Sequence, residues 1–222
     1  MPVSLIKRVH IDLHRRIALE RRVAVLSREI AALLPEACTV LDVGCGSGEI
    51  AKAMVAQKQN ISLDGIDLIA RPDCAIAVRA FDGTTFPVAD KSYDFVTLVD
   101  VLHHTPDPMV LLREALRVAR TGVIVKDHNC NSRVRSIIMT ITDTLGNWQY
   151  GVPLLFNFWT TSRWQQAWRE LGLVQETYTT DIGLYPPIRG FIFAKDMDFI
   201  SRLRPARAVE GYAEAKSERA LQ

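Results

Sequence analysis

Three glycines at alternate positions, Gly44, Gly46 and Gly48, directly follow a short run, residues 39–43, that is rich in residues typical of β-strands. A strand that leads into closely spaced glycines and then a helix brings bare backbone against a ligand at the carboxyl edge of a sheet. The spacing differs from the dinucleotide fingerprint G-x-G-x-x-G, because Glu49 stands where its last glycine would be, and no Gly-Lys-Ser/Thr follows as in a phosphate-binding loop. The loop therefore predicts a ligand site without a pyrophosphate signal.

Two short polar segments that contain histidine, His103-His104 and Asp127-His128, each follow an expected strand. The carboxyl ends of parallel strands meet at one edge of a sheet, so both segments would lie near the glycine loop. Histidine titrates near neutrality and can take a proton from a hydroxyl or another weak nucleophile. Each segment is therefore a candidate general base, and the alternative for each is a structural role.

Strands and helices that would position these residues alternate along the chain. The expected strands cover residues 39–43, 61–67, 75–81, 93–99, 123–126, 173–179 and 191–194. The expected helices cover residues 4–34 in two pieces, 49–59, 107–120, 134–145 and 162–171. This alternation predicts an α/β fold, a doubly wound, mostly parallel sheet of seven strands with helices on both faces. The last two strands would pair as an antiparallel hairpin at the edge.

One domain, residues 37–200, is expected between an N-terminal helical extension, residues 1–36, and a charged C-terminal tail, residues 201–222. A segment at about residues 129–160 is long for a simple connection, so we expect a helical cap insertion there. Its aromatic residues are Trp148, Tyr150, Phe156, Phe158 and Trp159. They could wall a flat or lipophilic ligand, or form only the core of the cap.

Apolar and basic residues recur with helical spacing in the N-terminal extension. The apolar set is Leu5, Ile6, Val9, Leu13 and Ile17, and the basic set is Lys7, Arg8, Arg15, Arg16, Arg21 and Arg22. This pattern is typical of an amphipathic helix that packs on a core and shows its charges to water. Two alternatives remain, a basic lid over a bound ligand and a contact with a membrane surface.

The composition is that of an ordinary globular domain. The 222 residues are 48% hydrophobic and 23% charged, and the formal net charge is +2, whereas a dedicated nucleic-acid-binding protein is usually strongly basic. The four cysteines fit no zinc pattern. No signal-peptide pattern is present, and no apolar run reaches the ~20 residues that span a bilayer. We therefore expect a cytoplasmic monomer or homodimer with no nucleic-acid partner, no metal and no membrane span, while a peripheral membrane contact stays open.

Over roughly residues 38–127, the chain resembles the class I S-adenosylmethionine-dependent methyltransferases. The first motif of that family is matched by Leu41-Asp-Val-Gly-Cys-Gly-Ser-Gly48. The resemblance continues in order through Ile66-Asp67, Phe81-Asp82-Gly83, Phe86-Pro-Val-Ala-Asp-Lys-Ser-Tyr-Asp-Phe-Val96 and Val101-Leu-His-His-Thr-Pro-Asp107. It implies a Rossmann-like fold, S-adenosyl-L-methionine as cofactor and S-adenosyl-L-homocysteine as product. The nearest likeness is to the small-molecule and quinone-type branch.

The resemblance also implies contacts with the cofactor. Asp42, at the end of the first strand, would attract the ammonium of the amino acid part, and the three loop glycines would let the backbone approach that part. Cys45 would be a small filler within the loop. Asp67, at the end of the second strand, would accept both ribose hydroxyls, and Leu68 would pack on the adenine.

Two further segments of the chain would contact the cofactor. Asp82 would accept a hydrogen bond from the adenine amino group, with backbone contacts from Gly83, although Asp-Gly is also a common turn pair. Val99 and Asp100 would end the fourth expected strand beside the methyl group.

Methyl transfer from a sulfonium depends mainly on in-line positioning, and a general base is needed only for a hydroxyl or another weak nucleophile. The expected reaction is transfer to an O, N or C atom of a small hydrophobic or aromatic molecule. The alternatives are an RNA or protein methyltransferase and a non-catalytic module that binds S-adenosylmethionine. Residues 99–102 read Val-Asp-Val-Leu, unlike the Asn/Asp-Pro-Pro-Tyr/Phe motif of amino-methylating enzymes, and the glycine spacing disfavours a nicotinamide oxidoreductase.

Overall fold

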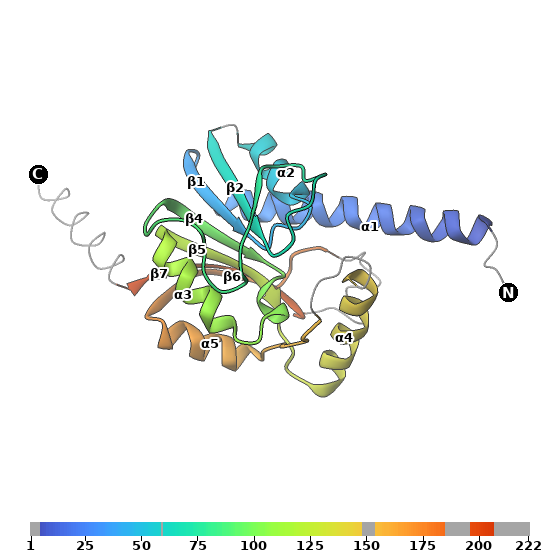
Figure 1. Cartoon of the computed structure of the whole chain (residues 1–222). Helices are drawn as coiled ribbons and strands as arrows, with labels where there is room; N and C mark the ends of the chain where they lie inside the picture. Colours follow the sequence, from blue (N-terminus) through green and yellow to red (C-terminus); the bar gives the residue numbers. More distant parts are fainter. Residues whose placement is uncertain (1–4, 59, 148–153, 185–195, 207–222) are drawn as a thin grey trace, which may run out of the picture.

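Seven described strands form one sheet in the order β3-β2-β1-β4-β5-β7-β6 (Figure 1). The computed structural model describes residues 5–58, 60–147, 154–184 and 196–206, although not the side chains of residues 5–17 and 145–147. The strands are β1 (Cys38–Val43), β2 (Ile61–Asp67), β3 (Val78–Ala80), β4 (Tyr93–Val99), β5 (Ala119–His128), β6 (Leu173–Thr179) and β7 (Asp198–Pro205).

The predicted α/β fold with a mostly parallel sheet of seven strands is confirmed. β1 pairs in parallel with β2 and β4, and β4 pairs in parallel with β5. β7 is antiparallel to both β5 and β6 and lies between them at this edge of the sheet. The strand expected at residues 191–194 lies outside the described residues. The partner of β6 is β7, which continues to Pro205 and so passes residue 200, after which the sequence predicts the tail to begin.

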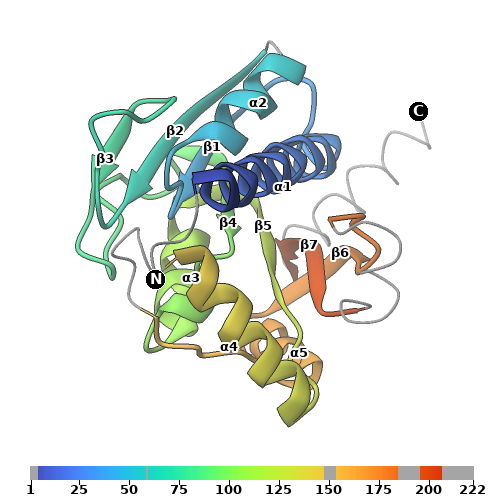
Figure 2. The same cartoon turned by 90° about the vertical axis from the view of Figure 1, so that its right-hand side faces the viewer.

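Helices cover both faces of the sheet, as Figure 2 shows. They are α1 (Leu5–Ala32), α2 (Glu49–Gln57), the short 3-10 helix η1 (Leu102–His104), α3 (Pro108–Val118), α4 (Arg133–Asn147) and α5 (Thr161–Glu170). On one face, α1 and α2 bury Leu26, Ile30 and Met54 in a shared core. On the other face, α3 and α5 bury Leu111 and Trp164 in a second core. This two-sided burial requires the near-continuous apolar strands seen in the sequence.

Three boundaries differ from the prediction. The N-terminal segment forms one helix rather than two pieces, because no glycine or proline stands between Pro2 and Pro35 to interrupt it. β3 is shorter than the predicted span 75–81, since within the described part of the chain it pairs with β2 alone. β5 is longer than the predicted span 123–126, because β4 and β7 pair with it on both sides.

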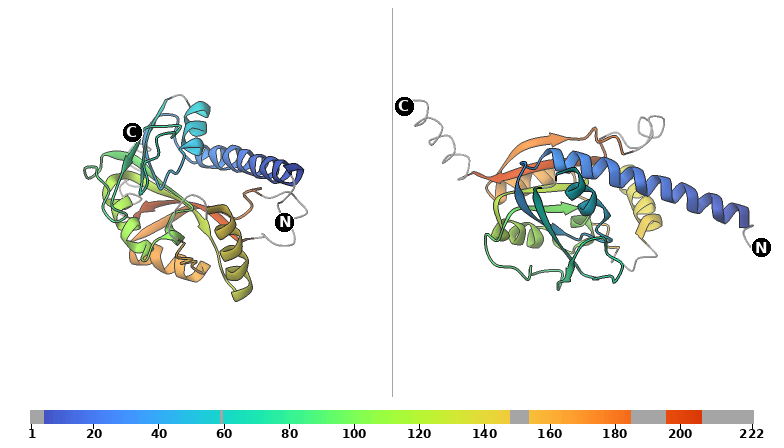
Figure 3. Two further views of the ribbon diagram at one scale, coloured as in Figure 1. Left: turned by 45° about the vertical axis from the view of Figure 1, so that its right-hand side comes forward. Right: turned by 90° about the horizontal axis from the view of Figure 1, so that it is seen from above.

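The carboxyl ends of the parallel strands define one end of the molecule. β1 ends at Val43 directly before the glycine loop, β4 ends at Val99, and β5 ends at His128. The first turns of α1 project beyond the sheet at this end, and α4 lies at the same end (Figures 1 and 3). None of the described helices combines the length and the apolar character that crossing a membrane requires.

Candidate active site

The turn from β1 into α2 is built from three glycines with a left-handed backbone. Gly44, Gly46 and Gly48 have φ angles of 68°, 57° and 73°, a region that residues with a Cβ atom rarely adopt. The Gly44 amide donates a 2.8 Å hydrogen bond to the carbonyl of Ile66. A Cβ atom at Gly44 would lie 2.5 Å from Cγ2 of Val101. The loop therefore lies closely against the carboxyl ends of β2 and β4.

Asp67, the last residue of β2, holds the loop from the other side. Its Oδ2 accepts a hydrogen bond from the Gly46 amide at 2.8 Å, and its Oδ1 accepts one from the Ile69 amide at 2.9 Å. The next side chain, Leu68, is 47% exposed, and a Cβ atom at Gly83 would lie 2.9 Å from its Cδ2. The structure thus brings together the glycine loop, a carboxylate, an uncovered apolar side chain and the turn at Gly83.

Asp42 is a buried carboxyl in β1, beneath the glycine loop. Its side chain is 5% exposed, and its Oδ1 accepts a 2.7 Å hydrogen bond from the Thr97 hydroxyl. Burial raises the pKa of Asp42 to about 6, against the opposing effect of the Thr97 hydrogen bond. A cation beside this carboxyl would lower its pKa again, so Asp42 is suited to pair with a ligand ammonium.

Asp82 and Gly83 form a turn that Asp82 stabilises with its own side chain. The Asp82 Oδ1 accepts hydrogen bonds from the amides of Thr85 at 2.7 Å and Thr84 at 2.8 Å, which lower the pKa of this exposed carboxyl. Gly83 has a φ angle of 83°. The turn accounts for one oxygen of Asp82, and a ligand contact by the other oxygen stays a prediction.

Cys45 fills space between the loop and β2. A Cβ atom at Gly65 would lie 2.6 Å from its Sγ, so the thiol occupies the room that this glycine leaves. Burial raises the pKa of the Cys45 thiol above its ordinary value. Because the thiolate is the reactive form of cysteine, this environment fits a packing role and not a nucleophile.

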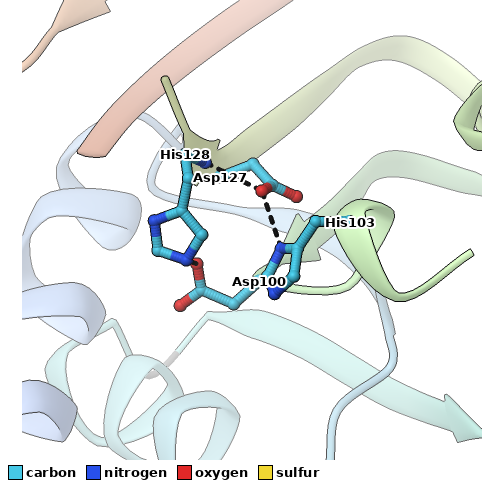
Figure 4. A group of neighbouring side chains, drawn as sticks. All are labelled: Asp100, His103, Asp127 and His128. Carbon is cyan, nitrogen blue, oxygen red and sulfur yellow. Dashed lines mark hydrogen bonds and ion pairs between the residues drawn. The ribbon is translucent and has the colours of Figure 1, made fainter. Parts of the chain in front are cut away.

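A charged cluster lies at the carboxyl ends of β4 and β5 (Figure 4). At its centre is Asp100, which follows β4 and has a φ angle of 53°. The Lys126 ammonium donates to Asp100 Oδ1 at 2.5 Å and to Asp198 Oδ1 at 2.6 Å, and Arg22 of α1 donates to Asp100 Oδ2. Burial would raise the pKa of Asp100, but the charges of Lys126 and Arg22 outweigh it and hold that pKa well below its usual range.

His103 is clamped between two carboxylates of this cluster. The side chain is 1% exposed, with Nδ1 2.8 Å from Asp127 Oδ1 and Nε2 3.6 Å from Asp143 Oδ1. Burial would lower its pKa, but the charge of Asp127, the hydrogen bond with Asp127 and the nearby Asp143 carboxylate raise it to about 10. His103 therefore carries a proton at neutral pH, which argues against it as the resting general base.

His128 is the histidine that faces Asp100. Its Nδ1 lies 2.9 Å from Asp198 Oδ1, and its Nε2 lies 3.4 Å from Asp100 Oδ1, as Figure 4 shows for Asp100. The Nε2 atom of His104 lies 3.6 Å from Asp143 Oδ1 on α4. The two histidine segments, which the sequence presents as separate candidates, therefore belong to one cluster.

Phe158, from the predicted cap insertion, packs against the two buried histidines. Its ring is stacked on His103 with ring centroids 5.1 Å apart, and it meets His128 edge-on at 5.9 Å. Trp159 instead packs on Trp164, with centroids 4.7 Å apart. Aromatic residues of the segment predicted to form a cap therefore contribute both to the cluster and to the core. The predicted aromatic residues that lie outside the described part of the chain are Trp148 and Tyr150.

Four side chains, those labelled in Figure 4, have donor atoms that all lie within 4.8 Å of one another, a spacing that could hold a metal ion. The carboxylate of Asp100, however, already pairs with Lys126 and Arg22. The chain thus supplies its own cations at this carboxylate, and we assign no metal to the cluster.

The family profile described as "Methyltransferase domain" matches residues 13–177, which is more than half of the chain. The chain belongs to the methyltransferase domain family. The matched span of this family domain contains the glycine loop, Asp67 and most of the charged cluster. It ends before β7, so Asp198 lies outside the matched span.

Curated relatives of this methyltransferase domain match over just under half of its length. The Ubiquinone biosynthesis O-methyltransferase of Aliivibrio fischeri is 29% identical over 114 residues, which cover 46% of this chain and 48% of the relative. The 27-O-demethylrifamycin SV methyltransferase of Amycolatopsis mediterranei is 30% identical over 119 residues, covering 47% of this chain and 43% of the relative. The chain thus spans about half the length of the curated relatives it matches.

Solved structures share the fold of this methyltransferase domain at low sequence identity. One is from the complex between the Haloferax volcanii Trm112 methyltransferase activator and a methyltransferase, with a TM-score of 0.60, 19% identity and coverage of 87% of this chain and 94% of the other. Another is a plantazolicin methyltransferase solved with a desmethylPZN analog and SAH, with a TM-score of 0.56, 16% identity and 86% coverage of both chains. These likenesses show the fold.

Four members of the charged cluster do not follow from the sequence motifs. They are Arg22, Lys126, Asp143 and Asp198. The pairing of Lys126 could have been predicted from the sequence, because a lysine inside a fully buried strand is almost always paired. The other three come from α1, α4 and β7, and one sequence does not show that these elements meet at the ends of β4 and β5.

The folding stability of this methyltransferase domain should fall in alkaline solution because of His103. The pKa of His103 is about 10 in the folded chain against an ordinary value of 6.5. A raised pKa stabilises the fold fully below the lower value, and the contribution is lost as pH rises through the higher one. We expect the urea midpoint to fall between about pH 7 and pH 10, and to fall less in His103→Gln. His104→Gln, as the matched control, should keep the wild-type slope; an equal slope in His103→Gln would contradict the assignment.

Proposed function

We propose that this chain is an S-adenosylmethionine-dependent methyltransferase that methylates an O, N or C atom of a small hydrophobic or aromatic molecule and releases S-adenosyl-L-homocysteine. One observation carries the proposal: a glycine loop held by Asp67 lies at the same sheet edge as the charged cluster around Asp100. Membership of the methyltransferase domain family supports it. Relatives named for O-methylation of small molecules favour this class of acceptor over RNA or protein.

The residues at this edge suit the parts of S-adenosylmethionine. Asp67 would accept hydrogen bonds from the ribose hydroxyls, and the exposed Leu68 would pack on the adenine, with the Asp82 turn beside it. Asp42 would pair with the ammonium group, because a neighbouring cation would stabilise the ionised form of its buried carboxyl. When bound, the cofactor supplies an electrophilic methyl group, and Val99 and Asp100 at the end of β4 would lie beside it.

His128 is the residue we assign as the general base for a hydroxyl acceptor. Its Nε2 faces Asp100, and its Nδ1 lies 2.9 Å from Asp198, which would fix the ring orientation as a carboxylate does for a catalytic histidine. His128 would take the hydroxyl proton while the oxygen lone pair bonds to the methyl carbon. His104 is the second candidate, and Asp127 holds His103 as a cation that orders this edge of the sheet.

Cofactor binding tests the proposal directly. Calorimetric titration with S-adenosylmethionine should show micromolar affinity, and titration with nicotinamide dinucleotides should show none. A methyl-transfer screen over hydroxylated aromatic and lipophilic molecules would then identify the acceptor. Absence of S-adenosylmethionine binding would overturn the proposed function, and binding without transfer to any acceptor would favour the non-catalytic alternative.

Asp67→Ala should weaken S-adenosylmethionine binding by about 10–100-fold, because hydrogen bonds to a charged acceptor contribute about 1.5–3 kcal/mol. The calorimetric Kd measures this effect, and thermal unfolding checks that the fold is retained. Asp64→Asn is the matched control, since Asp64 lies in the same strand and accepts its hydrogen bond from Tyr93 at 2.6 Å. Unchanged affinity in Asp67→Ala would contradict the ribose role.

A further inference from the structure

Positive charge is concentrated at the N-terminal end of α1. Residues 1–22 contain six lysine and arginine residues and two acidic residues, whereas the whole chain has a formal net charge of +2. The rest of the chain is therefore net acidic. The apolar residues of this stretch recur at helical spacing, at Leu5, Val9, Leu13 and Ile17. A helix with an apolar stripe and many cations is the type that lies in the interface of an anionic membrane.

The outer face of α4 is also apolar. Val134, Ile137 and Ile141 are 66%, 59% and 55% exposed, and their spacing places them on one face of the helix. The opposite side of α4 already has its own core, because Met139 is buried there against Cys130. Packing within the described part of the chain thus does not explain the outer stripe, and contiguous exposed apolar residues mark interaction surfaces.

The two elements border the same site. Arg22 of α1 bonds to Asp100, and Asp143 of α4 contacts His103. Figures 1 and 2 show the first turns of α1 and the whole of α4 at the same end of the molecule. We call residues 5–22 of α1 together with the outer face of α4 the rim surface.

We propose that the rim surface binds a membrane surface that contains anionic lipids. The cations of α1 would approach lipid phosphates, and the three aliphatic side chains of α4 would enter the interfacial region. Arg133, which is exposed beside the stripe, adds a further cation. A lipophilic acceptor could then reach the charged cluster directly from the membrane. A second copy of the chain fits this surface less well, because a two-fold interface would bring the same basic helix against itself.

Vesicle sedimentation with the full chain tests this proposal without cofactor or acceptor, so its failure is distinguishable from failure of the proposed function. We expect binding to phosphatidylcholine vesicles that contain phosphatidylglycerol, little binding to phosphatidylcholine alone, and weaker binding at high salt. The double variant Ile137→Ser/Ile141→Ser and the single variant Arg133→Glu should each lower the partition coefficient by about tenfold or more.

Matched control variants distinguish vesicle binding through the rim surface from nonspecific binding. Val174→Ser changes a 39% exposed residue on β6, and Arg113→Glu reverses an exposed charge on α3; both should bind vesicles like the wild type. Circular dichroism should show every variant folded. The proposal is overturned by absent binding to anionic vesicles, by equal binding to neutral vesicles, by equal losses in the controls, or by light scattering that shows a dimer abolished by the α4 variants.

Discussion

Replacing Lys126 by methionine is expected to lower the free energy of unfolding by about 3–5 kcal/mol. Lys126 is 1% exposed, and its ammonium lies 2.5 Å from Asp100 and 2.6 Å from Asp198. Removal of one partner from a buried ion pair leaves the remaining charges without compensation. Methionine matches the length of the lysine stem, so cavity formation contributes little. The midpoint of urea unfolding should fall while the slope of the transition stays unchanged.

Two further variants show whether charge causes this loss. The double variant Lys126→Met/Asp198→Asn removes one of the carboxylates that lose their compensating cation in Lys126→Met. It should therefore recover part of the stability lost in the single variant. Arg120→Met breaks the ion pair with Asp94, in which the arginine side chain is 43% exposed, and should cost at most about 1 kcal/mol. Equal small losses in Lys126→Met and Arg120→Met would show that the buried pairing contributes little.

His128→Gln is expected to lower turnover on a hydroxyl acceptor by about 10²–10⁴-fold, the usual contribution of a general base. Affinity for S-adenosylmethionine should stay within about twofold, because the side chains assigned to bind its amino acid part, ribose and adenine, Asp42, Asp67 and Leu68, belong to β1 and to the end of β2. Single-turnover rates with an acceptor from the methyl-transfer screen measure the first effect, and calorimetry measures the second.

His104→Gln provides the matched comparison for this assignment. His104 pairs with Asp143, whereas His128 pairs with Asp198, so the loss of His104 should slow turnover less than the loss of His128. Asp198→Asn should act through His128, by shifting the pH profile of turnover while leaving cofactor affinity unchanged. Full turnover in His128→Gln on a hydroxyl acceptor would transfer the base role to another group or remove the need for one.

The glycine loop could be predicted because its signal is local. The strand, Gly44 to Gly48 and the first turn of α2 are contiguous, and their order along the chain is also their order in space. Asp67 follows from the same logic, since it ends the next strand. The raised pKa of Asp42 could not be predicted, because it depends on burial by other elements and on the hydroxyl of Thr97 in β4. The Asp82 turn is local, and its Asp-Gly pair is visible in the sequence.

The charged cluster could be predicted only in part, because five elements that are distant in sequence assemble it. The histidines were visible at the ends of two strands, but their shared environment was not. Arg22 and Asp143 come from α1 and α4, whose packing directions are not encoded in any short motif. Asp198 was missed for a different reason: β7 begins where the sequence pattern places only the end of the domain.

The position of β7 has a consequence for the order in which the chain can fold during synthesis. Among the described strands, β6 joins the sheet through β7 alone, and β7 is the last of them along the chain. Until residue 205 has left the ribosome, β5 therefore presents an unpaired edge, and the ammonium of Lys126 lacks the Asp198 half of its pairing. Completion of the sheet and completion of the charged cluster are thus one late event, during which a nascent chain is exposed to edge-to-edge association.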